Sequence, residues 1–274
     1  MQGPLRIIFS IAILAMWIVF GIWLSRGDWS PLQWAMLAAA HGACLVIFYN
    51  FAYVFTYGYA ISALAVHLVI LGSHPSPAAL LVAGLCILYG LRLWSFVHGR
   101  NRDAGYREIR ARGDQIHGRT PFAAKLALWI MMGWLMAFQG MAAYFAALHG
   151  TVSAAIAIGA ALMLLGLLLE AAADRHKQRV KAGDPGGFAH TGLYARTRHP
   201  NYLGEIVFQC GLIIVAIGSA PNALALLGAT VAPLYIAILM YYAAREADQK
   251  QQQRYAQRSE YLEWRERTGM LLPG

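Results

Sequence analysis

The sequence predicts an all-α integral membrane protein, a polytopic bundle of seven or eight transmembrane helices. Hydrophobic residues make up 59% of the 274 residues and charged residues only 13%, which is too apolar for a soluble domain of this size. Several uncharged runs approach the roughly 20 residues that a spanning helix needs. Strict alternation of apolar and polar residues, which a membrane β-barrel requires, is missing.

The apolar runs follow one another with short polar links between them. The first run lacks a small-residue cleavage site followed by a soluble domain, so we expect a retained helix rather than a signal peptide. Residues 57–72 are short for a span and could form either a full helix or a re-entrant segment. Pro75 and Pro77 then predict a tight turn. The predicted spans are 7–25, 32–55, 78–91, 126–148, 152–169, 206–220 and 222–244.

Basic residues predict the orientation in the membrane. Of 22 Lys and Arg residues, 18 lie in segments 99–120, 174–200 and 245–274, whereas the links at 74–77, 149–151 and 219–221 contain none. This alternation places the three basic segments and the C-terminus on the cytoplasmic face of one domain, residues 1–274. The pattern suits a bacterial inner membrane, and an endoplasmic reticulum protein would show it too. The net charge of +9 has two interpretations. The basic residues either only set the topology or also line a vestibule that binds an anion.

A few charged residues lie where a membrane helix makes charge costly. Glu170 and Glu205 are at the ends of apolar runs, and Arg92 is well inside one. Intramembrane charges of this kind usually mark function. Asp174 follows Glu170 by four residues, as Glu205 follows Asn201, so each pair shares a helix face. Pro200 suits a first helical position, and the helix amides beside His199 would favour a phosphate or carboxylate.

Other features have simpler interpretations. Cys44, Cys86 and Cys210 lie in apolar runs and are expected to be buried free thiols, and His41 and His67 are expected to be structural. The sequence has no metal-ligand spacing, phosphate-binding glycine loop, Gly-x-Ser-x-Gly elbow or nucleic-acid-binding motif. The tail 245–267 is predicted to be helical and to fold back over the cytoplasmic face. Its aromatic residues, Tyr255, Tyr261 and Trp264, are predicted to lie at headgroup level.

Residues 192–205, GLYARTRHPNYLGE, resemble the signature shared by steroid 5α-reductases, sterol reductases and isoprenylcysteine carboxyl methyltransferases. The Arg-His-Pro-Asn-Tyr core fits both reductases and methyltransferases. Two upstream patterns are similar to those of the steroid 5α-reductase branch and its bacterial relatives. One is Gly166-x-x-x-Glu170-x-x-x-Asp174, and the other is Tyr89-x-x-Arg92, which Arg102 and Tyr106 follow. The resemblance covers roughly residues 85–274.

The resemblance implies a seven-helix fold that holds NADPH among the cytoplasmic loops and the last four helices. It implies that Tyr89 donates a hydrogen bond to the substrate ketone, with Arg92 one turn further on. Human members share this work with a Gln-Glu pair on an early helix, and the corresponding region 55–63 lacks such a pair and has Tyr57, Tyr59 and Ser62. The implied cofactor-binding residues are Asp174, Asn201 and Glu205, followed by Glu170, Arg179, Lys181, Arg198, His199, Tyr202 and Arg102.

The expected function is NADPH-dependent reduction of the carbon–carbon double bond of an enone in a hydrophobic substrate such as a 3-oxo-Δ4-steroid, taken from the lipid. The alternative is an S-adenosylmethionine-dependent membrane methyltransferase, with Glu205 binding the amino group of its cofactor. NADPH carries three phosphates and S-adenosylmethionine none, so the basic excess favours NADPH. A transporter is disfavoured, because the charged groups lie at helix ends and no sequence repeat is visible.

Overall fold

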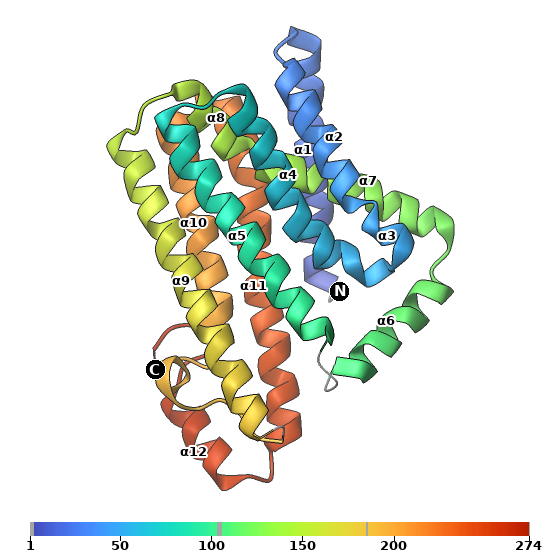
Figure 1. Ribbon diagram of the computed structural model, residues 1–274, viewed down its shortest axis with the longest axis vertical. Helices are drawn as coiled ribbons and strands as arrows, with labels where there is room; N and C mark the ends of the chain where they lie inside the picture. Colours follow the sequence, from blue (N-terminus) through green and yellow to red (C-terminus); the bar gives the residue numbers. More distant parts are fainter. Residues whose placement is uncertain (1–2, 103–105, 185, 274) are drawn as a thin grey trace. The chain divides into compact units, whose positions relative to one another are not determined.

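The computed structural model describes residues 3–102, 106–184 and 186–273 (Figure 1). Of the described residues, 85% are helical, and the only β-type pairing among them is an isolated bridge between Thr197 and Gly269. Seven helices in these ranges are long and apolar enough to cross a membrane. The predicted all-α polytopic membrane fold is therefore confirmed.

The spanning helices extend beyond the apolar runs at several ends. They are α1 (Gly3–Arg26), α2 with α3 (Pro31–Cys44 and Val46–Tyr49), α5 (Pro77–Arg102), α7 with α8 (Phe122–Gln139 and Met141–His149), α9 (Ala154–Gly183), α10 (Pro200–Ser219) and α11 (Ala223–Tyr255). The short run at 57–72 forms a continuous helix, α4 (Tyr57–Ser73). At about 1.5 Å per residue, its 17 residues extend about 26 Å, slightly less than the hydrocarbon thickness of a bilayer.

The chain forms two compact units. Unit 1 comprises Met1–Ala160 and Leu212–Pro233, and unit 2 comprises Ala161–Gly211 and Leu234–Gly274. The candidate residues on α5 therefore belong to unit 1, whereas the signature segment and the C-terminal tail belong to unit 2. Each unit is described by itself.

In unit 1, α4 packs against both α2 and α5. A Cβ on Gly90 of α5 would lie 2.9 Å from the carbonyl oxygen of Ala60 on α4, so only glycine permits this approach. The first basic segment forms α6 (Arg107–Arg119), which is tied to the 3₁₀ helix η1 (Phe51–Phe55). Asn50 donates to Asp114 at 2.7 Å, and the Phe51 amide donates to His117 Nδ1 at 2.9 Å.

In unit 2, the second basic segment and the tail pack together through aromatic side chains. The cluster consists of Phe188, Tyr255 at the end of α11, and Tyr261 and Trp264 of α12 (Ser259–Arg267). The Trp264 indole also donates to the Tyr194 carbonyl in η3 (Gly192–Ala195) at 2.8 Å. Tyr255, Tyr261 and Trp264, the three rings predicted to lie at headgroup level, are at least 95% buried within the protein. Burying their apolar area against the loop outweighs the interfacial preference of single Tyr and Trp side chains.

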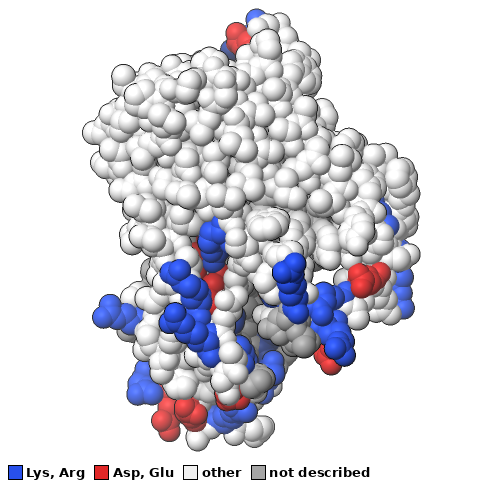
Figure 2. All heavy atoms as spheres, in the orientation of Figure 1, with Lys and Arg blue, Asp and Glu red and all other residues white. Residues whose placement is uncertain are grey.

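The distribution of charge agrees with the apolar character of the spans. On the face drawn in Figure 2, the Lys and Arg side chains of unit 1 gather along α6, and those of unit 2 gather where α9 and α11 end and on α12.

Cys44 and Cys86 are buried as predicted, but Cys210 is exposed on the surface of α10. His41 Nδ1 lies 2.9 Å from the carbonyl oxygen of Leu37, and His67 Nδ1 lies 2.7 Å from that of Ala63, four residues earlier in each case.

Candidate functional site

Unit 2 contains a cluster of buried carboxylates, which we call the carboxylate cluster: Glu170, Asp174 and Glu205. Glu170 and Asp174 lie one turn apart on α9, and their exposed fractions are 9% and 6%. Glu205 lies in the second turn of α10, is 3% exposed and accepts a hydrogen bond from Gln209 Nε2 at 2.7 Å. Buried carboxylates are costly unless they are compensated, so this cluster is the clearest chemical feature of the unit.

Two glycines bring these helices together. A Cβ on Gly204 would lie 2.6 Å from the backbone nitrogen of Glu170, and a Cβ on Gly166 would lie 2.5 Å from the carbonyl oxygen of Gly204. Both distances are shorter than any real Cβ contact, so α9 and α10 touch backbone to backbone. This contact places Glu205 of α10 beside the turn of α9 that carries Glu170.

Replacing Gly204 with alanine should therefore force α9 and α10 apart. Overpacking of this kind costs about 1–3 kcal/mol, because the obstacle is backbone and cannot rotate away. We expect a lower unfolding midpoint of the detergent-purified protein. Gly183→Ala is the control, since a Cβ at Gly183 on α9 meets nothing within 4 Å. Equal midpoints for the two variants would contradict the close helix contact.

The signature segment is anchored by an ion-pair network around Asp248 of α11. Arg198 Nε donates to Asp248 Oδ1 at 2.7 Å, and Arg265 Nη1 lies 2.8 Å from Oδ2. His199 Nε2 is 3.4 Å from the same Oδ1. Arg198 also donates to the carbonyls of Arg265, at 3.1 Å, and Thr268. Asp248 of α11 therefore joins the signature segment, through Arg198, to α12 of the C-terminal tail, through Arg265.

The backbone ahead of α10 is also paired with the tail. The amides of Arg198 and His199 donate to the carbonyls of Gly269 and Met270 at 2.9 and 3.1 Å, and the Thr197 hydroxyl donates to Met270 at 3.0 Å. These two amides consequently already have acceptors, although α10 does begin at Pro200 as predicted. An anion at this helix end would have to bind further into its first turn.

The other predicted cofactor residues of unit 2 differ in accessibility. Lys181 donates to the Gly187 carbonyl at 2.5 Å and to the Tyr255 hydroxyl at 3.2 Å. It therefore connects the end of α9 to the loop that follows it and to the end of α11. Arg179 is exposed, whereas Asn201 and Tyr202 are partly buried. The Tyr202 ring centroid lies 5.7 Å from that of His199.

Tyr89 of unit 1 is buried, and its ring meets that of Tyr59 on α4 edge to face at 5.8 Å between centroids. Tyr59 belongs to region 55–63, for which the resemblance implied a Gln-Glu pair. The Arg92 guanidinium lies over the Phe96 ring at 5.4 Å. Arg102, at the end of α5, is exposed. Unit 1 therefore has two adjacent tyrosines, Tyr59 on α4 and Tyr89 on α5, and Arg92 lies one turn after Tyr89 on α5.

Comparison with known proteins identifies a family. A family described as "protein of unknown function (DUF1295)" matches residues 43–268, most of the chain. The chain belongs to the DUF1295 family. Neither the curated proteins nor the solved structures that were compared contain a match. The region matched to DUF1295 includes every candidate site residue named above, and the tail carbonyls of Gly269 and Met270 lie just beyond it.

Sequence reasoning missed three residues of this DUF1295 protein. Asp248 and Arg265 lie among many charges in the tail, and nothing in the sequence distinguishes them from their neighbours. Tyr194 is 2% exposed, and its hydroxyl has no hydrogen-bond partner among the described residues. Burial, followed by the nearby charge of Asp174, raises the pKa of Tyr194, so its hydroxyl stays protonated beside the carboxylate cluster.

The buried His199 should make stability depend on pH. Burial lowers the pKa of His199, Asp248 opposes that shift, and Lys177 and Arg198 add to it. The folded state then binds fewer protons than the unfolded state, in which His titrates near about 6.5. The His199 contribution is therefore constant above that pH and is lost as the pH falls below it.

We expect the unfolding midpoint to fall between about pH 7.5 and pH 5.5 less steeply in His199→Gln than in the wild type. Thermal unfolding in detergent across this range measures the difference. His74→Gln, which removes an exposed histidine in the turn before α5, is the matched control and should keep the wild-type slope. The same slope in all three proteins would contradict the assignment.

Proposed function

We propose that this protein is an NADPH-dependent reductase that saturates the carbon–carbon double bond of an enone in a hydrophobic, membrane-dissolved substrate, with 3-oxo-Δ4-steroids as the substrate class. The observation that carries the proposal is the carboxylate cluster, which is formed by Glu170 and Asp174 of α9 and by Glu205 at the C-terminal end of the signature segment 192–205. Ionised carboxylates only accept hydrogen bonds, and they suit the ribose hydroxyls and carboxamide of a nicotinamide nucleotide. Membership of a family associated with steroid 5α-reductase-like proteins supports it.

In this proposal, Glu170, Asp174, Asn201 and Glu205 hold the sugar and carboxamide groups of NADPH, which supplies a hydride when it is bound. The exposed arginines of the second basic segment, Arg179 among them, are available for the phosphates. Tyr202 and His199 border the same site. The long apolar helices suit a flat apolar substrate that arrives from the lipid.

Tyr89 is the proposed electrophilic group. Hydride addition at the β carbon of an enone leaves negative charge on the carbonyl oxygen, and a hydroxyl donor aimed at that oxygen stabilises the transition state more than the ground state. An unperturbed tyrosine, with a pKa near about 10, is such a donor at neutral pH. Tyr59 supports the Tyr89 ring from α4, and Arg92 adds a positive charge one turn away.

The proposed location is a bacterial inner membrane, with the three basic segments and the C-terminus in the cytoplasm. The alternation of basic and uncharged links supports this orientation. It would place the carboxylate cluster and the second basic segment on the side where NADPH is available. A reporter fused to the C-terminus that is active only in the periplasm would contradict it.

One observation favours a second candidate, an S-adenosylmethionine-dependent methyltransferase. Two of the cations predicted to bind the cofactor are engaged within the chain: Arg198 by Asp248 and Lys181 by Gly187 and Tyr255. The three buried carboxylates would also suit a cofactor that carries positive charge. Glu205 would then bind the amino group of that cofactor.

The deciding experiment identifies the nucleotide that the detergent-purified protein retains, by mass spectrometry of the denatured supernatant. NADP(H) is expected in the wild type, and its amount should fall in Glu205→Gln. Glu246→Gln, which alters an exposed carboxylate of α11, is the matched control and should retain the wild-type amount. Retention of S-adenosylmethionine or its demethylated product would replace the reductase with the methyltransferase.

A further inference from the structure

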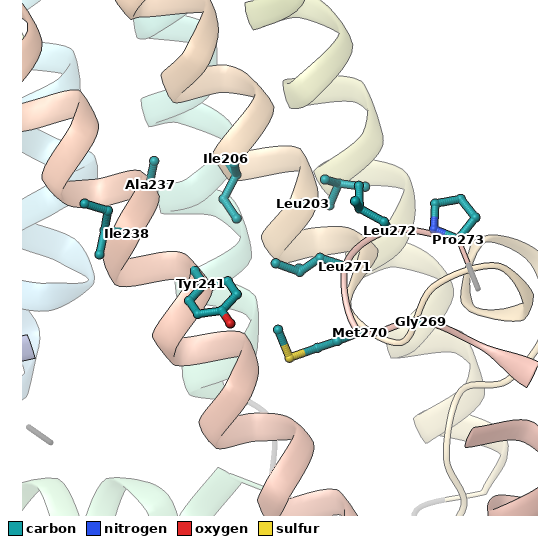
Figure 3. A pocket seen from close by; sticks show the side chains of 10 residues that line it. All are labelled: Leu203, Ile206, Ala237, Ile238, Tyr241, Gly269, Met270, Leu271, Leu272 and Pro273. Carbon is teal, nitrogen blue, oxygen red and sulfur yellow. The ribbon is translucent and has the colours of Figure 1, made fainter. Parts of the chain in front are cut away.

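Unit 2 has an apolar pocket that the proposed reaction does not use. It has a volume of about 690 Å³, which lies within the usual range for ligand pockets, roughly 300–1,000 Å³. Its walls come from α10, from α11 and from the last residues of the tail (Figure 3). The lining residues are Leu203, Ile206, Ala237, Ile238, Tyr241 and Gly269–Pro273.

The pocket lies on the far face of α10 from the carboxylate cluster. Gly204 and Phe208 of α10 contact Gly166 of α9. With 3.6 residues per turn, Leu203 and Ile206 point roughly 150° away from that contact. A ligand in the pocket is therefore on the other side of the helix from Glu205, and the pocket is distinct from the proposed cofactor site.

The chemistry of the lining excludes a charged ligand portion inside the pocket. None of the lining residues is charged, and the Tyr241 hydroxyl is the only polar side-chain group among them. Two walls belong to helices that are long and apolar enough to cross a membrane. In Figure 3, Leu271 and Met270 project from the tail toward α11, and Ile206 points into the same space. A hydrocarbon chain is the ligand that such walls favour.

A cation beside the pocket specifies the rest of the ligand. Arg245 lies one turn beyond Tyr241 on α11, so both residues share one helix face, and both are exposed. This face runs from the apolar lining to a hydroxyl and then to a guanidinium, toward the charged end of α11. The order matches a phospholipid, whose acyl chain is followed by ester oxygens and then by a phosphate that arginine binds well.

We propose that the space between α10, α11 and the C-terminal tail binds one acyl chain of a membrane phospholipid, with the lipid phosphate near Tyr241 and Arg245. The third wall exists because the tail is anchored to the signature segment: the carbonyls of Gly269 and Met270 accept from the amides of Arg198 and His199. The same tail residues thus hold the signature segment with their backbone and close the lipid site with their side chains.

The test uses the full-length protein in vesicles of phosphatidylglycerol and a phosphatidylcholine that carries a photoreactive diazirine in one acyl chain. The protein is solubilised and washed exhaustively with mild detergent, which removes loosely bound lipid, and is then irradiated. Peptide mapping by mass spectrometry locates the label. We expect label on the segments that contain Ile206, residues 237–241 and Leu271.

Two variants fill the pocket from α11, Ala237→Phe and Ile238→Phe. Ala237→Phe adds six side-chain carbons and Ile238→Phe adds three, so we expect at least about tenfold less retained label for Ala237→Phe and a smaller loss for Ile238→Phe. Ile217→Phe, at a position on α10 that is 61% exposed, is the matched control and should retain the wild-type amount. Using two filling variants keeps the test decisive if one of them fails to fold.

The headgroup is tested with Arg245→Gln and with a diazirine-labelled diacylglycerol, which has no phosphate. We expect Arg245→Gln to retain less phosphatidylcholine, and the wild type to retain less diacylglycerol than phosphatidylcholine. Label spread evenly over lipid-facing helices, or label unchanged by the filling variants, would overturn the proposed site. Equal retention of diacylglycerol and phosphatidylcholine would overturn the assignment of a phospholipid.

Discussion

Asp248→Asn should release the C-terminal tail and destabilise unit 2 by about 3–5 kcal/mol, the usual cost of removing one partner from a buried ion pair. The Asp248 side chain is 8% exposed and accepts from both Arg198 and Arg265. Asparagine keeps the shape but removes the charge, so two guanidinium groups lose their counterion where little water can replace it. Thermal unfolding of the detergent-purified protein should show the loss as a lower midpoint.

Limited trypsin digestion gives a second readout of the same variant. A released tail should be cut faster after the exposed residues Arg254 and Arg258. Glu246→Gln is a control on the same helix, because Glu246 forms only an exposed pair with Lys250 and such pairs contribute about 0–1 kcal/mol. If the two variants unfold at the same midpoint and are cut at the same rate, the network does not anchor the tail.

Tyr89→Phe should reduce turnover by about 100- to 1000-fold, the usual cost of removing one hydrogen-bond donor to a developing oxyanion. The substitution removes the hydroxyl and keeps the ring, which is 4% exposed and packed against Tyr59. The fold and the retained nucleotide should therefore stay unchanged. The measurement is NADPH-dependent reduction of a panel of 3-oxo-Δ4-steroids by the detergent-purified protein.

Tyr49→Phe is the matched control for this loss, since Tyr49 is 80% exposed, and it should keep full turnover. Near-full turnover by Tyr89→Phe would remove Tyr89 from the chemistry and leave it as a packing residue. Because the nucleotide is measured separately, such a result would not by itself exclude an NADPH-dependent reaction in which another group donates the hydrogen bond to the carbonyl oxygen.

Much of the candidate site could be predicted from local spacing. The four-residue separation of Glu170 and Asp174 is enough to place both on one face of a helix, and Pro200 indicates where α10 begins. The same reasoning could not reveal the role of Arg198. A guanidinium in a loop can bind a phosphate or a carboxylate equally well, and its partner, Asp248, lies 50 residues away.

The interpretation of the tail shows the same limit. Its helical character and its aromatic residues were visible in the sequence, but the burial of these rings within the protein was not. Single aromatic residues among charges prefer the interface. Here Phe188, from a different segment, completes a buried cluster with Tyr255, Tyr261 and Trp264. Only the packing of two distant segments reveals that cluster.

The sequence by itself determined the membrane class, most of the long apolar helices, the segments in which basic residues gather and the helices that carry the buried carboxylates. These properties depend on composition and on periodicity within single helices, which are local. The tertiary structure decided which cations are already occupied, how closely α9 approaches α10 at Gly166 and Gly204, and where the tail closes an apolar pocket. Each of these depends on contacts between residues that are far apart in the chain, and no local pattern encodes such contacts.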